Sequence, residues 1–319
     1  MISTAARALG LLLLANGAIA APAWQATTVV MHAVQVGEHC WYVAGRLEDA
    51  SRENQGFMSN AGSVITHAGV VVFDALGSPA LAQRLIDIIR QHTAQPIRRV
   101  IISHYHADHF YGVPALRAVG AEIWANTLAH RYLNTEAAQS RLAQRRTTLG
   151  PWLGKNFELP LPDRWLSEDE SFDMGGLRFR LQHVGPGHAP EDLTMLIEED
   201  SVVFAGDTVY AGRVPFVGTA DTALWLLAIE RLLAIRARVL VPGHGPASYA
   251  PREDLQLTYD YLSFLRAEMG RAVADFQPFD DAYAGTNWGR FAKLPTFAAA
   301  NRANAYNVYL QIEQETLHP

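Results

Sequence analysis

Residues 101–110 read IISHYHADHF, so three histidines and an aspartate fall within six consecutive positions directly after an apolar run. Burying such side chains together costs free energy unless a partner satisfies them. Alternate side chains of extended backbone point the same way, which directs His104 and His106 toward one point. Asp108 and His109 fall where the chain turns toward a helix and can face an adjacent point. Imidazole with carboxylate suits zinc, and also iron or manganese, so we predict a metal site here.

The rest of the chain alternates strand-like and helix-like segments in two similar halves. Each half has strands, then a helix, then a strand that ends in a histidine-bearing loop. This order predicts an α/β fold in which two sheets pack face to face with helices outside, a four-layer αββα sandwich. We expect strands at 29–36, 40–44, 63–66, 70–74, 99–103 and 121–126, several more within 171–206 and one at 238–245, with helices at 78–93, 112–120, 221–236, 252–272 and 298–316.

Three further segments carry polar residues just after a strand-like run or a Gly/Pro turn. They are His188 in GPGHAPED, Asp207 in FAGDTVY and His244 in VPGHGPA. Polar groups can converge at strand ends without disrupting a strand ladder. With the first stretch they make seven candidate ligands, too many for one tetrahedral ion but enough for two ions that share a bridge. The other histidines, including His183, we expect to be ordinary surface or core residues.

The segments HYHADH, GPGH, AGDT and PGHG resemble the ordered metal motifs of the metallo-β-lactamase superfamily, whose fold is the same αββα sandwich. The resemblance implies that His104, His106 and His188 hold one metal. Asp108, His109 and His244 would hold the other, and Asp207 would bridge the two. Asp74, at the end of VVVFD, would support the ligands as a second-layer hydrogen-bond partner. The implied cofactor is a pair of Zn²⁺ ions, with iron or manganese as alternatives.

Position 207 bears on function within this superfamily. Several β-lactamase subclasses place a cysteine or serine near here, whereas this chain has an aspartate, as in hydroxyacylglutathione hydrolases of the glyoxalase II type. The segments NQGFMSNAGSVIT, SHYHADHFYG and VPGHGPAS resemble exported zinc metallohydrolases associated with quinoprotein oxidation and sulfur-oxidation gene sets.

The resemblance implies a metallohydrolase in which a metal-bridging hydroxide attacks an ester, thioester or related acyl bond. Asp108 is the expected catalytic residue and would orient the nucleophile. Three alternatives stay open: a mononuclear iron persulfide dioxygenase, a β-lactam hydrolase, and a non-catalytic metal-bearing accessory protein of a periplasmic oxidation system.

The N-terminus has the features of a secretory signal peptide. Arg7 precedes a short apolar run at 9–14, and Ala18-Ile19-Ala20 fits a cleavage site. We therefore expect a signal peptide at 1–20 and a periplasmic or secreted protein with no membrane attachment after cleavage.

Residues 21–319 are expected to form a single domain of the metallo-β-lactamase type. A helical insertion around 127–165 and a C-terminal helical extension after 272 would shape the pocket entrance. The net charge of −6, without a Lys/Arg run, argues against nucleic-acid binding. The expected partner is a small-molecule substrate, and the oligomeric state is left open.

Overall fold

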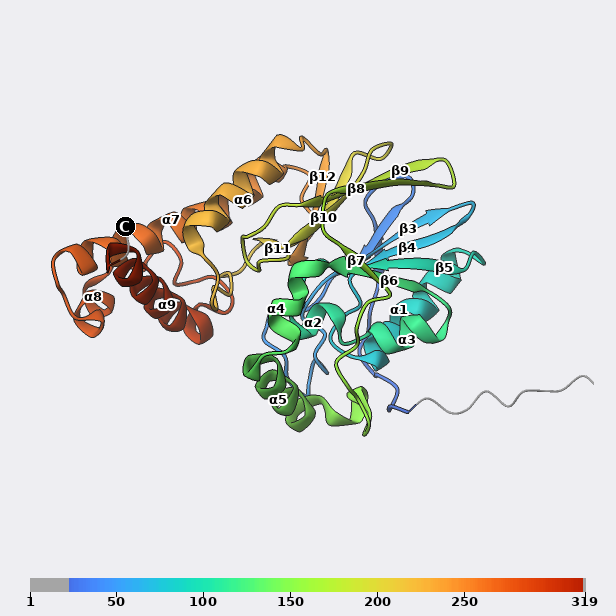
Figure 1. Ribbon diagram of the computed structural model, residues 1–319, viewed down its shortest axis with the longest axis horizontal. Coiled ribbons are helices and arrows are strands. Elements are labelled where there is room, and N and C mark those ends of the chain that lie inside the picture. Colours follow the sequence, from blue (N-terminus) through green and yellow to red (C-terminus); the bar gives the residue numbers. More distant parts are fainter. Residues whose placement is uncertain (1–22, 318–319) are drawn as a thin grey trace, which may run out of the picture.

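The computed structural model describes residues 23–317, so the expected signal peptide at 1–20 lies outside the described residues. Two β-sheets and a set of helices form this part of the chain (Figure 1). No helix in the described range is long and apolar enough to cross a membrane.

The first sheet contains seven strands that lie side by side in sequence order. Strands β1 to β4 pair antiparallel, and β5, β6 and β7 continue the sheet in parallel. Parallel neighbours need a crossover, and α1 supplies one between β4 and β5. The strands are β1 (Ala33–Gln35), β2 (Cys40–Val43), β3 (Ala61–Thr66), β4 (Gly69–Phe73), β5 (Ile97–Ile101), β6 (Glu122–Asn126) and β7 (Arg164–Leu166).

The second sheet contains five strands in the order β12-β11-β10-β9-β8. Strands β8 to β11 form an antiparallel meander, and β12 joins β11 in parallel after helix α6. The strands are β8 (Glu170–Met174), β9 (Leu177–His183), β10 (Leu193–Ile197), β11 (Val202–Tyr210) and β12 (Val239–His244).

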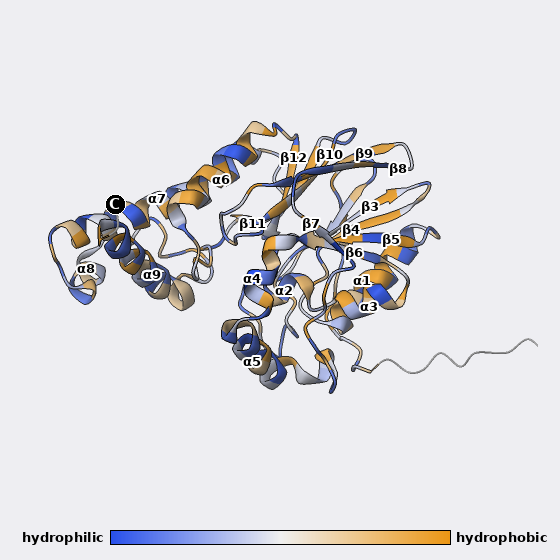
Figure 2. Ribbon diagram, in the orientation of Figure 1, coloured by the Kyte–Doolittle hydropathy of each residue, from blue (hydrophilic) through white to orange (hydrophobic). Residues whose placement is uncertain are grey.

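A hydrophobic core fills the space between the two sheets. In β4, Val71 and Phe73 belong to this inter-sheet core, whereas Val70 and Val72 belong to the core on the other face, as the two-residue period of a strand requires. Phe204 of β11 approaches Phe73 from the opposite sheet, with ring centroids 5.7 Å apart. Strands β4, β11 and β12 are therefore buried on both faces, whereas β8 and β9 at one edge of the second sheet expose alternate residues, and Figure 2 shows hydrophobic and hydrophilic strand segments accordingly.

Helices cover the outer face of each sheet (Figure 1). Helix α1 (Pro79–His92) begins at Ser78, whose Oγ accepts a hydrogen bond from Leu81 N, with proline at the first helical position. It packs with α3 (Val113–Ala118) on the first sheet, and α6 (Thr222–Ala234) and α7 (Pro251–Ala274) pack on the second. The expected αββα sandwich is confirmed.

Further helices lie in the segment between β6 and β7 and after α7. The first group consists of a 3₁₀ helix at Thr127–Ala129, α4 (His130–Leu133) and α5 (Glu136–Leu153). The second consists of α8 (Phe279–Gly285) and α9 (Phe297–Leu317), which pack on α7 beyond the edge of the sandwich (Figure 1). Helices α4 and α8 lie within the segments expected to be helical, although their bounds were not predicted, and α2 (Ala107–Phe110) was not predicted because four residues are too few to show a helical period.

Candidate metal centre

The histidine-rich stretch leaves the first sheet at the end of β5. His106 has extended backbone, and the short helix α2 begins directly after it. Asp108 and His109 therefore lie on a helical turn and not in the loop expected from the sequence. The side chains of His104 and His109 are fully buried, and Asp108 is 8% exposed.

Asp207 and His244 come from neighbouring strands of the second sheet. Asp207 lies inside β11, at a register irregularity next to Gly206, which has a φ of +54°. The expectation that it follows a strand was wrong, because the strand continues through this irregularity to Tyr210. His244 is the last residue of β12, and its Nδ1 is 2.7 Å from the carbonyl oxygen of Met58.

Gly243 makes room for the Asp207 carboxylate. A Cβ atom at this position would lie only 1.9 Å from Asp207 Oδ1. Glycine in the Pro-Gly-His-Gly segment is therefore needed for close approach between β12 and the carboxylate.

The seven candidate ligands lie together in two groups. The ligand atoms of each group lie within 4.8 Å of one another, one group being His104, His106, His188 and Asp207 and the other Asp108, His109 and His244. Asp207 lies between them. Its Oδ2 is 3.5 Å from His188 Nε2 and 3.3 Å from His244 Nε2, and its Oδ1 is 3.2 Å from His109 Nε2.

Several of these buried atoms have no hydrogen-bond partner within the described residues. Three of them, His104 Nε2, His109 Nε2 and Asp207 Oδ1, face other ligand atoms, whereas the fourth, His188 Nδ1, is the ring nitrogen opposite the one that faces Asp207. His106 Nδ1 and His188 Nε2 face each other at 2.8 Å. Unpartnered buried imidazole and carboxylate atoms cost free energy, and a cation at the meeting point of the first three would satisfy them. The donor set therefore fits metal ions of the kind that bind nitrogen and oxygen ligands.

The protonation states of His106, His188 and Asp207 also fit metal binding. Burial lowers the pKa of His106 to about 4, and burial together with His106 lowers the pKa of His188 to about 3. Burial by itself would raise the pKa of Asp207, but the nearby His244 and His109 hold it well below its usual range. Neutral imidazole and ionised carboxylate are the forms that coordinate cations. At His109 and His244 burial opposes protonation, but Asp207 and Asp108 raise the pKa of both imidazoles, so these two would release a proton when a cation binds.

Hydrogen bonds hold the ligand segments in place. Asp74 accepts from Ser103 N at 2.7 Å and from Ser103 Oγ at 2.9 Å, and its Oδ2 is 2.8 Å from His109 Nδ1. Asn60 Nδ2 donates to the carbonyl oxygens of Pro242 and Gly245, on either side of His244. The first-sheet ligand His109 is thus fixed from the end of its own sheet, whereas the segment of the second-sheet ligand His244 is fixed by Asn60, which directly precedes β3 of the first sheet.

A cavity of about 350 Å³ opens onto both ligand groups. Besides the ligands, its lining includes Met58, Tyr132, Phe216 and three arginines, Arg141, Arg145 and Arg213. The arginines were not singled out from the sequence. The four-residue spacing of Arg141 and Arg145 on one helix was the available signal.

The tyrosines beside the ligands differ in their roles. Tyr210 lines the cavity and donates a hydrogen bond to Asp207 Oδ2. Tyr105 and Tyr111 instead pack around Phe110 in the core of the first sheet. Outside the cavity, His183 Nε2 contacts the carbonyl oxygen of Pro190, and the residue belongs to neither ligand group.

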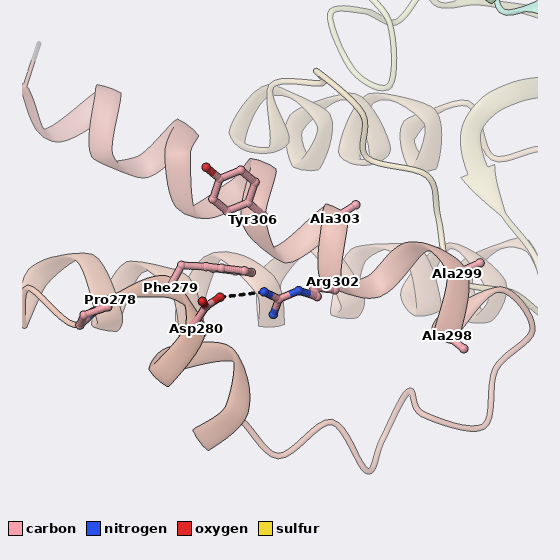
Figure 3. Close-up of a pocket in the computed structure, with 8 residues that line it drawn as sticks. All are labelled: Pro278, Phe279, Asp280, Ala298, Ala299, Arg302, Ala303 and Tyr306. Atoms are coloured by element: carbon pink, nitrogen blue, oxygen red, sulfur yellow. Dashed lines mark hydrogen bonds and ion pairs between the residues drawn. The ribbon is translucent and has the colours of Figure 1, made fainter. Parts of the chain in front are cut away.

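A larger hollow of about 720 Å³ lies on α8 and α9, at the far end of the C-terminal helices (Figure 3). Its charged lining residues, Asp280 and Arg302, pair with each other at 2.7 Å. None of the seven candidate ligands lines it. We therefore place the candidate site in the smaller cavity.

Residues 54–244, more than half of the chain, match the family model of the metallo-beta-lactamase superfamily. The chain belongs to the metallo-β-lactamase superfamily. The matched range contains both ligand groups and Asp74. The superfamily resemblance expected from the sequence motifs is confirmed, whereas the narrower likeness to exported enzymes of quinoprotein and sulfur oxidation stays a prediction.

Named relatives in this superfamily are hydrolases of several kinds. The linear primary-alkylsulfatase of a Pseudomonas species is 22% identical over 241 residues, which cover 64% of this chain and 45% of that protein. The hydroxyacylglutathione hydrolase GloC of Haemophilus influenzae is 27% identical over 170 residues, which cover 51% of this chain and 76% of that protein. This chain therefore spans less than half of the alkylsulfatase.

Solved structures of superfamily members share the fold. The metallo-beta-lactamase from Pontibacter korlensis superposes with a TM-score of 0.58 at 21% identity, covering 73% of this chain and 99% of that chain. The sec-alkylsulfatase Pisa1 from Pseudomonas gives a TM-score of 0.68 at 19% identity, covering 91% of this chain and 52% of that chain. Superfamily membership thus accounts for the αββα architecture around the ligand groups.

Proposed function

We propose that this chain is an exported, metal-dependent hydrolase that cleaves an ester, thioester or related acyl bond. The observation that carries the proposal is the position of Asp207, whose carboxylate oxygens face imidazole nitrogens of both ligand groups at 3.2–3.5 Å. A carboxylate between two such groups suits a pair of cations with a shared ligand.

The two groups divide the proposed ligands. His104, His106 and His188 would hold one ion, Asp108, His109 and His244 the other, and Asp207 both. Zinc is the proposed metal, and iron or manganese would accept the same nitrogen and oxygen donors. Such ions supply a Lewis acid that lowers the pKa of water and polarises an acyl carbonyl.

The chain's own residues would bind and orient the reactants. The Asp108 side chain is 12% exposed, lines the cavity, and can accept a hydrogen bond from the attacking water. Tyr210 would keep the Asp207 carboxylate oriented through its hydrogen bond. Met58 and Phe216 would contact apolar parts of a substrate and exclude bulk water.

Hydrolysis of a sulfate ester is a second candidate. It is favoured by the alkylsulfatase relative, whose match covers 64% of this chain. The two candidates differ in the bond that is cleaved, so a substrate panel separates them.

The decisive experiment is elemental analysis of the purified mature protein, followed by turnover of ester, thioester, lactone, lactam and alkyl sulfate substrates with and without chelator. Two zinc ions and chelator-sensitive acyl hydrolysis would support the proposal. One iron and oxygen consumption with a persulfide would indicate a dioxygenase, and preferred lactam cleavage a β-lactamase. A protein loaded with both metals that turns over none of these substrates would be a non-catalytic accessory protein.

A ligand variant links metal to activity in the same experiment. His106→Ala should lower metal content and turnover together. His67, which is exposed in the turn between β3 and β4, provides the matched control, and His67→Ala should leave both unchanged.

A further inference from the structure

Arg213 is a buried arginine whose donors are largely unused. Its side chain is 2% exposed and lines the cavity above the ligand groups. Its Nη1 has no hydrogen-bond partner among the described residues. The contacts that it does make, to Asp49 Oδ1 and to the carbonyl oxygen of Val214, are both 3.5 Å long. A guanidinium in this state lacks the hydrogen bonds that normally compensate burial.

Two more arginines reach the same cavity from helix α5. Arg141 and Arg145 are four residues apart and therefore lie on one face of the helix. Arg141 Nη1 donates to Gln144, and Arg145 Nη2 has only the sulfur of Met58, at 3.9 Å. Neither forms an ion pair with a carboxylate in the part of the chain that the structure describes.

A purely structural role explains Arg213 poorly. Its partner Asp49 is 61% exposed on the side chain, and an ion pair with one exposed partner at 3.5 Å contributes little stability. The cavity lining carries three arginines and three carboxylates, Asp49, Asp108 and Asp207. If cations neutralise Asp108 and Asp207, the cavity has an excess of positive charge that favours an anionic ligand.

We propose that the substrate carries an oxyanion group, such as a carboxylate, and that Arg213 and Arg145 bind it. This inference rests on the proposed function, because it names the substrate class of the same site. The planar guanidinium of Arg213 can donate two parallel hydrogen bonds to an oxyanion, and Arg145 on helix α5 can donate a third. Substrates without a negative group would lose these bonds.

Equilibrium binding tests the inference without any turnover. Glutarate and its uncharged diamide, glutaramide, would be titrated calorimetrically into metal-loaded and metal-free protein, with propanesulfonate and inorganic sulfate as further probes. Glutarate should bind at least tenfold more tightly than glutaramide. Arg213→Gln and Arg145→Gln should each weaken glutarate binding about ten- to a hundredfold. Comparison with the sulfonate and sulfate shows which oxyanion is preferred.

Two controls separate binding from structure. Arg146 is adjacent on α5 but lies outside the cavity lining and donates to the carbonyl oxygen of Phe157, so Arg146→Gln should bind glutarate as the wild type does. Asp49→Asn removes the long ion pair of Arg213 and should keep or increase the affinity. Equal losses in Asp49→Asn and Arg213→Gln would show a structural role and overturn the inference. If Arg213→Gln does not fold, Arg145→Gln decides the question by the same measurement.

Kinetics distinguish this inference from the proposed function. For a pair of thioesters that differ only in a terminal carboxylate, Arg213→Gln should reduce the preference for the charged one at least tenfold, mainly through KM. Metal-dependent hydrolysis with equal binding of glutarate and glutaramide would overturn the inference alone. Arg213-dependent glutarate binding by a protein that hydrolyses nothing would overturn the proposed function alone.

Discussion

Replacing Asp74 by asparagine should change which ring nitrogen of His109 carries the proton, although His109 itself is not substituted. Asp74 is 1% exposed and accepts three hydrogen bonds, from Ser103 N, from Ser103 Oγ and from His109 Nδ1. A backbone N–H can only donate, so the amide oxygen of an asparagine must remain opposite Ser103 N. The NH₂ group of the asparagine then faces His109 Nδ1. This nitrogen must lose its proton in order to accept a hydrogen bond from the amide.

The displaced proton moves to His109 Nε2, the atom that faces Asp207 Oδ1 at 3.2 Å and Asp108 Oδ2 at 3.4 Å. A protonated nitrogen cannot coordinate a cation. We expect affinity for the metal in the Asp108–His109–His244 group to fall about ten- to a hundredfold. Loss of a charge-assisted hydrogen bond in the core should also cost about 2 kcal/mol of stability.

Competition titration of zinc against a chromophoric chelator resolves the two binding steps, and thermal unfolding of the metal-free protein gives the stability change. Asp87→Asn makes the same change on the surface of α1 and serves as the control. Unchanged affinity in Asp74→Asn, or equal weakening of both steps, would refute the tautomer argument.

Three further predictions concern catalysis, metal and pH. Asp108→Asn should reduce kcat/KM about a hundredfold or more while the unfolding free energy of the metal-free protein changes by less than about 1 kcal/mol, which activity assays and thermal denaturation of the metal-free protein measure. Removing the metals with a chelator should lower the melting temperature by about 5–10 °C, since each ion at a hundred times its Kd contributes about 2.7 kcal/mol, and calorimetry at several zinc concentrations checks this. Burial opposes ionisation of Asp200, but hydrogen bonds from the His39 side chain and backbone outweigh it and lower its pKa below the ordinary 3.8. The stabilisation is therefore present above about pH 4 and lost as the pH falls through the folded-state pKa, so the roughly 1 kcal/mol deficit of Asp200→Asn in urea unfolding should disappear in acid.

The positions of the main strands and long helices were predictable because each has a clear period or a distinct boundary. Ser78-Pro79 marks the start of α1, and the apolar run before His104 marks β5. The order of the polar segments was equally informative, since the histidine-rich stretch follows β5, His188 follows β9 and His244 ends β12. Their convergence therefore followed from the predicted architecture.

Other features depend on tertiary contacts that no local pattern reveals. Asp207 was expected after a strand, but the irregularity at Gly206 lets β11 continue beside β12. Arg213 follows β11 in a segment with no period, and its burial depends on the cavity walls. Helix α2 is a single turn, and its four residues were indistinguishable from a loop.

The ligand groups draw on both sheets, with the β5–α2 connection on one side and β11, β12 and His188 on the other. Apart from hydrogen bonds such as those from Asn60 to the β12 segment, the sheets meet largely through apolar side chains, which resist sliding only weakly compared with a coordination shell of fixed bond lengths. Bound ions coordinated from both sheets would therefore fix the two layers relative to each other. A core substitution that shifts one layer by a fraction of an ångström would then show itself first as altered coordination, long before the protein unfolds.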